Sequence, residues 1–271
     1  MNSSGKKFVD LQLKKIEEHL KKYMNSSENK IDEAVKYTLF APCKRIRPLI
    51  MISFYELCGG KSDEIYKFAC ALEMIHTYSL IHDDLPCMDN DSLRRGKKCS
   101  HLEFGESTAL LAGDALLTKA FEIASTGNFL NYEKAVKCIN TLAYFAGPEG
   151  MILGQYKDLN SKYLNENIID VHRLKTSCLF VAAAKIGALL AGAEEKDISL
   201  AFKFGLNYGI AFQLIDDILD EDLNLSENVN GIKVKDLINK IFDKEKEILK
   251  KFKGDISPLE YLLDFVYSKI N

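Results

Sequence analysis

The sequence has few of the residues that build disulfide scaffolds, zinc sites or extended chains. Its seven cysteines are scattered, odd in number and include no C-x-x-C pair, which argues against a disulfide framework and a zinc site. Only 5 of the 271 residues are proline and 47% are apolar, so a disordered or collagen-like chain is excluded. The length and the apolar fraction are sufficient for a folded chain with a sizeable core.

An excess of one charge and a long apolar run are also lacking. The 36 basic and 39 acidic residues give a net charge of -3, so we expect no nucleic-acid partner. The longest apolar stretch, Cys178 to Ala193, is interrupted by Lys185 and is too short to span a membrane. The first residues contain no apolar signal-peptide region. We therefore expect a cytoplasmic protein without stable membrane insertion.

Helical periodicity extends along almost the whole chain. The first apolar stripe consists of Phe8, Leu11, Leu13, Ile16 and Leu20. Runs of alternating β-branched residues are absent, and Asn230-Gly231 is the one hairpin signal. Turn signals separate segments of roughly 15–30 residues, as in a helix bundle. The pattern predicts one all-α domain over residues 1–271, with Cys178 to Ala193 as a buried central helix.

Two acidic clusters follow apolar helical runs. They are IHDDLPCMDNDSLRRG, at residues 81–96, and FQLIDDILDED, at residues 212–222. Asp216 and Asp220 are four residues apart and share a helix face. Two carboxylates about 4 Å apart repel by about 4 kcal/mol at an effective dielectric near 20, so a cation should lie between them. In the first cluster, Pro86 breaks the helix and allows Asp89 to return toward Asp83.

Carboxylate clusters favour Mg²⁺, which completes its octahedron with water and substrate phosphate. The sequence therefore predicts a Mg²⁺ site and a phosphorylated substrate. One acidic or basic group alone is more often a solvated surface charge, but several basic groups accompany the two clusters, and these can bind an anion. They are Lys44, Arg45 and Arg47, then Arg94 and Arg95, and finally Lys175 with Thr176.

Together these motifs resemble the trans-isoprenyl diphosphate synthase family. The resemblance covers residues 30–220 and depends on five motifs in the family's order. They are KRIRP (the basic motif), HTYSLIHDDLPCMDNDSLRRG (the first aspartate-rich motif, with DDxxxxD), LLAGDALL, GQYKDL, and FQLIDDILD (the second aspartate-rich motif). The resemblance implies a single polyprenyl synthase domain, an orthogonal helix bundle of the isoprenoid synthase type with a central cavity, and a homodimer.

The resemblance also implies a reaction, in which isopentenyl diphosphate condenses with dimethylallyl or geranyl diphosphate. Three Mg²⁺ ions would be held by Asp83, Asp89 and Asp216 and act as Lewis acids on the leaving diphosphate. Residues expected to support the ions, directly or through water, are Asp84, Asp217 and Asp220. Arg94 and Lys175 would spread the charge of the diphosphate.

The family pattern places the diphosphate of isopentenyl diphosphate on a basic group of residues. This group consists of Lys44, Arg47, His76 and Arg95, completed by Phe212 and Gln213. Further expected substrate-binding residues are Thr176, Gln155 and Asp158. His76 has an alternative interpretation as a hydrogen-bonded core histidine.

Two residues just before the first aspartate motif, Tyr78 and Ser79, are expected to set product length. In the family, this position forms the floor of the elongation pocket. A bulky Tyr78 together with DDxxxxD resembles the bacterial farnesyl diphosphate synthases, so we expect farnesyl diphosphate as the product. A geranylgeranyl or geranyl diphosphate synthase is the alternative, and Tyr78→Ala would distinguish the two.

The chain departs from the family pattern in two places. Pro42 and Cys43 stand where the family has two glycines, and a side chain at position 43 could crowd a diphosphate. No lysine lies between Asp217 and Lys233, where the family has lid lysines, so the lid is either truly short or lacks a stretch of chain. A short lid would slow closure over substrate.

The missing lid lysines favour a second hypothesis, a non-catalytic subunit of a synthase. The six intact motif aspartates argue against it. A terpene cyclase, the third hypothesis, usually carries an Asn/Ser/Glu metal motif where this chain has DDILD.

Overall fold

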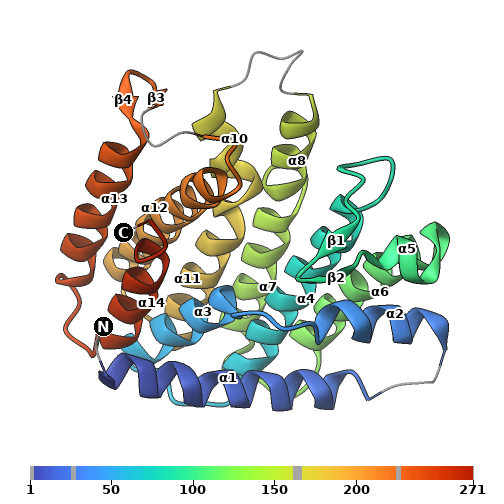
Figure 1. The fold of residues 1–271 in the computed structure, drawn as a ribbon. Coiled ribbons are helices and arrows are strands. Elements are labelled where there is room, and N and C mark those ends of the chain that lie inside the picture. The colour runs from blue at the N-terminus through green and yellow to red at the C-terminus, as the bar shows by residue number, and fades with distance from the viewer. Residues whose placement is uncertain (1–2, 26–28, 161–166, 224–226, 271) are drawn as a thin grey trace.

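The computed structural model describes residues 3–25, 29–160, 167–223 and 227–270, and these fold almost entirely into helices (Figure 1). This confirms the all-α prediction. The first elements are α1 (Ser3–Tyr23), α2 (Lys30–Leu39), α3 (Ile46–Leu57), α4 (Ile65–Asp83), β1 (Leu93–Arg94), β2 (Lys97–Lys98), α5 (Ser100–Phe104) and α6 (Glu106–Ser125). They are followed by α7 (Tyr132–Ala146), α8 (Met151–Leu159), α10 (Ile168–Lys175), α11 (Ser177–Ala191), α12 (Glu195–Leu219), β3 (Asn228–Val229), β4 (Ile232–Lys233), α13 (Val234–Leu249) and α14 (Ser257–Tyr267).

Helix α11 is the buried central helix that the sequence predicts, and it packs against α12, α3 and α7. Its alanines and glycines let neighbouring backbones approach closely. A Cβ atom added at Gly187 would lie 2.3 Å from the carbonyl oxygen of Met51 on α3. The helix ends at Gly192, whose φ of 81° is the left-handed conformation that favours glycine. The close packing fixes α12 and α3 relative to each other.

Helices α4 and α12 carry the two aspartate clusters at their C-terminal ends. Helix α4 ends at Asp83, before Pro86 rather than at it. Beyond this end the chain turns back, and the amide of Asp89 donates to the carbonyl of Asp83 at 2.9 Å. The predicted return of Asp89 toward Asp83 is therefore confirmed. Helix α12 ends just before Asp220.

Helix α12 is also long and apolar enough, by length and composition alone, to cross a membrane. However, 56% of its most apolar window is buried inside the protein. Core helices meet the same criteria, so this helix is weak evidence for a span.

Two short hairpins interrupt the helices. In β3–β4, the turn residues Asn230 and Gly231 have φ values of 52° and 78°, as a two-residue type I′ turn requires. Asn230-Gly231 is the hairpin signal noted in the sequence, although an all-α domain was predicted. The β1–β2 hairpin was not predicted, and its turn residues Arg95 and Gly96 also have positive φ, 55° and 75°. Two basic residues of the first motif, Arg94 and Arg95, are thus held on a hairpin rather than on a helix.

Several helices are shorter than the predicted 15–30 residues, including α2, α8 and α10. The structure differs most from the predicted helices at Thr176, where α10 and α11 meet at a bend of 45°. Lys175 and Thr176 therefore lie at a helix junction, where both line the cavity described below.

Candidate active site

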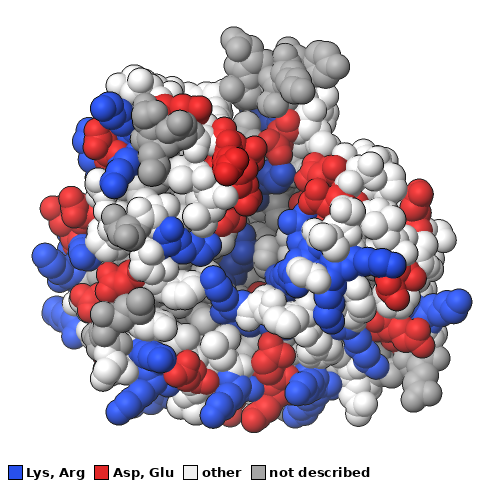
Figure 2. Space-filling model, viewed as in Figure 1, with Lys and Arg blue, Asp and Glu red and all other residues white. Residues whose placement is uncertain are grey.

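A cavity of about 860 Å³ lies between the ends of α4, α8, α10 and α12. The face shown in Figure 2 is hollowed, with acidic and basic side chains around the opening. Most of the predicted site residues line the cavity. They are Arg47, His76, Tyr78, Ser79, Asp83, Asp89, Arg94, Arg95, Gln155, Lys175, Thr176, Phe212, Gln213, Asp216 and Asp220. The remaining predicted residues, Lys44, Asp84, Asp158 and Asp217, are not among its lining residues.

The two adjacent aspartates of each cluster have different positions. Asp83 lines the cavity, whereas Asp84 is buried and accepts hydrogen bonds from Arg94 Nε at 2.8 Å and Nη2 at 2.6 Å. Arg94 also pairs with Asp91 at 2.5 Å. The buried aspartate of the first cluster therefore orients an arginine that faces the cavity.

The second cluster repeats this arrangement. Asp216 lines the cavity, whereas Asp217 is buried. Asp217 lies 2.9 Å from His172 Nε2 and accepts from Gln213 Nε2 at 2.7 Å. Gln213 in turn accepts from the Thr176 hydroxyl at 2.6 Å. Asp217 thus positions the polar side chains between α10 and α12.

Three of the carboxyl groups that line the cavity have raised pKa values. Burial raises the pKa of Asp83 to about 7, with Asp89 adding to the shift and Lys175 opposing it. The pKa of Asp89 is raised by burial and by Asp158, again against Lys175. The pKa of Asp220 is raised by burial and by Asp216. A cation bound among these groups would stabilise their charged forms.

The donor set fits a hard cation. Asp83, Asp89, Asp216 and Asp220 supply only oxygen, the ligand type that Mg²⁺ prefers. Within the described residues, no three His, Cys, Asp or Glu side chains lie close enough together to hold an ion alone. A Mg²⁺ ion here would need further ligands, and Mg²⁺ characteristically takes them from water and substrate phosphates.

Arg47 and Arg95 line the cavity, and each has a buried nitrogen without a hydrogen-bond partner among the described residues. Arg47 Nη1 donates to His76 Nε2 at 3.2 Å, but Arg47 Nε and Arg95 Nη1 have no hydrogen-bond partner among the described residues. Burial lowers the pKa of Arg47 to about 10, so it stays charged at neutral pH. Burial and Arg47 lower the pKa of His76 well below its usual range, which keeps its ring neutral. Buried donors of this kind require an acceptor, and an anion would supply it.

Lys175 lies between an aspartate of α8 and an aspartate of the loop after α4. It lies 2.5 Å from Asp158 Oδ2 and 4.0 Å from Asp89 Oδ2. Asp158 therefore orients Lys175 from outside the cavity. Both oxygen and nitrogen of the Gln155 side chain lack a partner among the described residues, although Gln155 lines the cavity.

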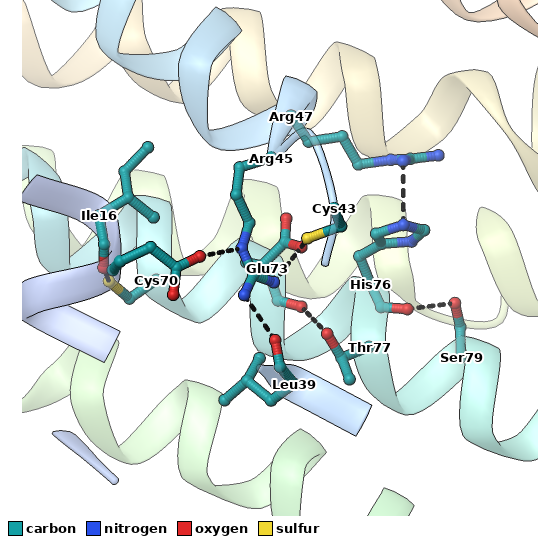
Figure 3. A network of polar contacts seen from close by, with 11 residues as sticks. Ile16, Leu39, Cys43, Arg45, Arg47, Cys70, Glu73, His76, Thr77 and Ser79 are labelled. Atoms are coloured by element: carbon teal, nitrogen blue, oxygen red, sulfur yellow. Dashed lines mark hydrogen bonds and ion pairs between the residues drawn. The ribbon is translucent and has the colours of Figure 1, made fainter. Parts of the chain in front are cut away.

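Arg45 has a different role from its neighbours in the basic motif. Figure 3 shows its side chain pointing toward Glu73 and the carbonyl of Leu39, whereas Arg47 points toward His76. Its side chain is 1% exposed and pairs with Glu73 at 2.7 Å and Glu17 at 2.8 Å. Its φ of 47° is left-handed, so these contacts hold a strained residue at the start of α3.

The two unusual residues of the basic motif do not crowd the cavity. Cys43 turns toward Glu73, with its Sγ 3.8 Å from Oε1, and neither Pro42 nor Cys43 lines the cavity (Figure 3). Lys44 also lies outside the lining, with its ammonium group 4.5 Å from the centre of the Phe265 ring.

Part of the cavity lining is apolar. Tyr78 lines it and is only 6% exposed, with its ring edge-on to His82 at a centroid distance of 5.6 Å. Ser79 also lines the cavity and donates to the carbonyl of His76 at 3.0 Å. Other apolar lining residues are Leu117, Met151, Ile152, Leu159 and Leu179.

Two residues close to the site were missed in the sequence. His172 pairs with Asp217, and its spacing from Lys175 and Thr176 on a helix could have indicated a shared face. Lys269 lies 3.3 Å from Asp216 Oδ1. No sequence signal marks Lys269, because tertiary folding alone brings it to Asp216.

The connection after Asp220 contains the β3–β4 hairpin. Asn167 Nδ2 donates to Asn230 Oδ1 at 3.1 Å, which links the hairpin to the start of α10. Part of the predicted short lid, residues 224–226, lies outside the described residues.

Comparison with known proteins supports the family resemblance. A family model described as polyprenyl synthetase matches residues 28–242. Geranylgeranyl pyrophosphate synthase 7, chloroplastic, of Arabidopsis thaliana is 43% identical over 215 residues, which cover 77% of this chain and 62% of that protein. The chain thus spans less than two thirds of this curated relative.

Two solved structures share the fold over nearly their whole length. A geranyltransferase from Legionella pneumophila has a TM-score of 0.89 and 30% identity, covering 98% of each chain. An FPP/GFPP synthase from Zymomonas mobilis has a TM-score of 0.88 and 28% identity, covering 99% of this chain and 100% of that one.

Proposed function

The chain belongs to the polyprenyl synthetase family, and from that membership we propose that it is a Mg²⁺-dependent prenyltransferase that joins isopentenyl diphosphate to an allylic diphosphate. One observation carries the proposal: the same cavity is lined by carboxylates from α4 and α12 and by two arginines, Arg47 and Arg95, each with a buried nitrogen that has no hydrogen-bond partner among the described residues. Carboxylates suit Mg²⁺, through which the allylic diphosphate would bind, and guanidinium groups suit the diphosphate of the second substrate.

Asp83, Asp89 and Asp216 would hold the metal, and we propose three ions per site. Bound Mg²⁺ would act as a Lewis acid on the leaving diphosphate. Lys175 and Arg94 face the same side of the cavity as Asp83 and Asp89, and they would balance the remaining charge of the allylic diphosphate. Asp158 and Asp84 orient these two cations.

Isopentenyl diphosphate would bind at Arg47, Arg95 and neutral His76. Their donors hold its diphosphate and orient its double bond toward the allylic carbon. When the allylic C–O bond breaks, that double bond attacks the cation, a C–C bond forms, and a proton passes to the departed diphosphate. The apolar wall around Tyr78 and Leu117 keeps water from the cation.

For the product we propose farnesyl diphosphate, because the buried Tyr78 ring occupies the apolar part of the cavity. The similarity to the Arabidopsis geranylgeranyl pyrophosphate synthase makes geranylgeranyl diphosphate the second candidate. The test is to incubate purified protein with Mg²⁺, dimethylallyl diphosphate and excess isopentenyl diphosphate and to measure product length. A C15 product supports the proposal, and a C20 product supports the second candidate. No condensation by folded protein would favour the non-catalytic subunit, for which the lack of lid lysines is the supporting observation.

Tyr78→Ala is expected to lengthen the product beyond that of the unchanged protein. Removing the ring opens space at the end of the cavity, so a longer prenyl chain fits. Product length is measured by chromatography of the dephosphorylated prenols. Tyr132→Ala is the matched control, since Tyr132 is 61% exposed and does not line the cavity. An unchanged product from an active Tyr78→Ala variant would show that Tyr78 does not limit chain growth.

We also propose that the protein forms a homodimer. Helices α6, α7 and α8 carry large exposed apolar side chains, which typically mark an interface. They are Leu110, Leu111, Val136, Tyr144, Ile152 and Tyr156. Light scattering coupled to size-exclusion chromatography should give twice the chain mass of 30.6 kDa. A monomer at all protein concentrations would refute this proposal.

A further inference from the structure

The motif LLAGDALL, at residues 110–117, has no role in the proposed reaction. It lies in the middle of α6, which packs against α4. The last residue of the motif, Leu117, lines the cavity. His82, on the α4 side of this contact, also lines the cavity and has no role in the proposed reaction.

Gly113 of this motif leaves the space that the His82 ring occupies. A Cβ atom added at Gly113 would overlap Nε2 and Cδ2 of His82, so a larger residue cannot share this position with the ring. His82 Nε2 also lies 3.0 Å from the carbonyl oxygen of Leu110 on α6. Because a carbonyl oxygen only accepts hydrogen bonds, this nitrogen carries the proton and donates. The His82 ring is therefore held against the backbone of α6.

The His82 ring in turn contacts Tyr78, the residue expected to limit product length. Tyr78 lies one helical turn before His82 on α4, and the two rings meet edge-on at a centroid distance of 5.6 Å. Both residues line the cavity, where the side chain of His82 is 21% exposed and Tyr78 is 6% exposed. The position of the Tyr78 ring therefore depends on a histidine that α6 holds in place.

We propose that His82 is a positioning residue that keeps the Tyr78 ring in the path of the growing prenyl chain and thereby helps to set product length. This inference rests on the proposed function. Without the imidazole, the Tyr78 ring can turn into the space between α4 and α6, and a longer chain then fits in the cavity. Gly113 and the Leu110 carbonyl take part indirectly, because they hold His82.

The alternative is that His82 only fastens α4 to α6. Two substitutions separate these roles, because they should change product length in opposite directions. His82→Ala frees the Tyr78 ring and should lengthen the product. Gly113→Ala forces the His82 ring toward the cavity that it lines, so the product should be shorter. Both substitutions can lower stability, but a loss of stability alone does not give opposite shifts in length.

The experiment measures the thermal midpoint of each variant and the prenols that a phosphatase releases after incubation with Mg²⁺, dimethylallyl diphosphate and excess isopentenyl diphosphate. His82→Ala should raise the ratio of the next longer product to the main product about tenfold, the scale on which pockets discriminate small apolar differences. Gly113→Ala should raise the ratio of the next shorter product to the main product. His82→Asn keeps a polar side chain but lacks the ring beside Tyr78, and it repeats the test if alanine prevents folding.

His19→Ala is the matched control, because the His19 ring stacks on another tyrosine of α4, Tyr66, at a centroid distance of 4.5 Å. Neither residue lines the cavity, so product length should not change. A double substitution tests how His82 acts. His82→Ala added to Tyr78→Ala should not lengthen the product further, since both changes remove the same obstacle.

Calorimetric titration with farnesyl and geranylgeranyl diphosphates, each alone in Mg²⁺ buffer, gives a readout independent of turnover. His82→Ala should favour the longer ligand about tenfold more than the unchanged protein does. An unchanged product and an unchanged ratio of the two affinities in folded His82→Ala would overturn the inference. Longer products from both His82→Ala and Gly113→Ala, or further lengthening in the double variant, would also overturn it. If the unchanged protein neither condenses the substrates nor binds these diphosphates, the proposed function itself fails.

Discussion

Asp83→Asn is expected to lower kcat about a thousandfold, which corresponds to about 4 kcal/mol in the reaction barrier. Asp83 faces the cavity, and burial raises its pKa to about 7. The amide of asparagine keeps the size of the side chain but loses the charge that holds a cation. Steady-state assays at saturating Mg²⁺ measure the effect. Asp10→Asn, which changes an exposed aspartate on α1, serves as the control.

The same variant should be more stable than the unchanged protein without metal. The pKa of Asp83 is raised from 3.8 to about 7 in the folded protein, so the unfolded chain releases this proton at lower pH. Ionisation of Asp83 therefore reduces stability as pH rises from about 4 to 7, and the reduction persists above pH 7. Urea denaturation in EDTA at pH 8 should show a higher midpoint for Asp83→Asn. A lower midpoint together with lost activity would mean that the substitution damages the fold instead.

Arg45→Met is expected to lower stability and Arg47→Met to lower substrate affinity, although the two residues are only two positions apart. Removing Arg45 leaves Glu73, 1% exposed, as a buried charge without its main partner, so the free energy of unfolding should fall by about 3–5 kcal/mol. Removing Arg47 eliminates a buried guanidinium with an unsatisfied Nε, so the fold should not be destabilised. Instead, the KM for isopentenyl diphosphate should rise about a hundredfold.

Urea denaturation and steady-state kinetics of both variants test this contrast. Lys44→Met is the control for stability, because Lys44 belongs to the same basic motif but has no buried ion pair in the described structure. If Arg47→Met were the unstable variant and Arg45→Met kept its fold but lost affinity, the assignment of the two arginines would be reversed.

The helices and most cavity residues could be predicted because their signals are local. The apolar run from Cys178 identified the central helix, and the aspartates at the ends of apolar segments identified both sides of the site. Pro86 correctly indicated that Asp89 turns back toward Asp83, because a proline interrupts a helix within one turn of its own position.

Other features depend on tertiary contacts that no local pattern encodes. The resemblance gave Asp83 and Asp84 different roles, but the sequence could not show that Asp84 is buried against Arg94 of the β1–β2 hairpin. For the same reason it could not show that Arg45 binds Glu73 while Arg47 binds His76. Lys269 approaches Asp216 only because α14 packs near α12.

Binding of an unreactive allylic diphosphate analogue, measured by calorimetry with and without Mg²⁺, tests the central claim most directly. In the proposed mechanism, carboxylates from α4 and α12 bind this diphosphate through Mg²⁺ in one cavity. We therefore expect tight binding in Mg²⁺, little binding in EDTA, and loss of the Mg²⁺-dependent component in both Asp83→Asn and Asp216→Asn. Equal binding with and without Mg²⁺, or unchanged binding in both variants, would contradict it.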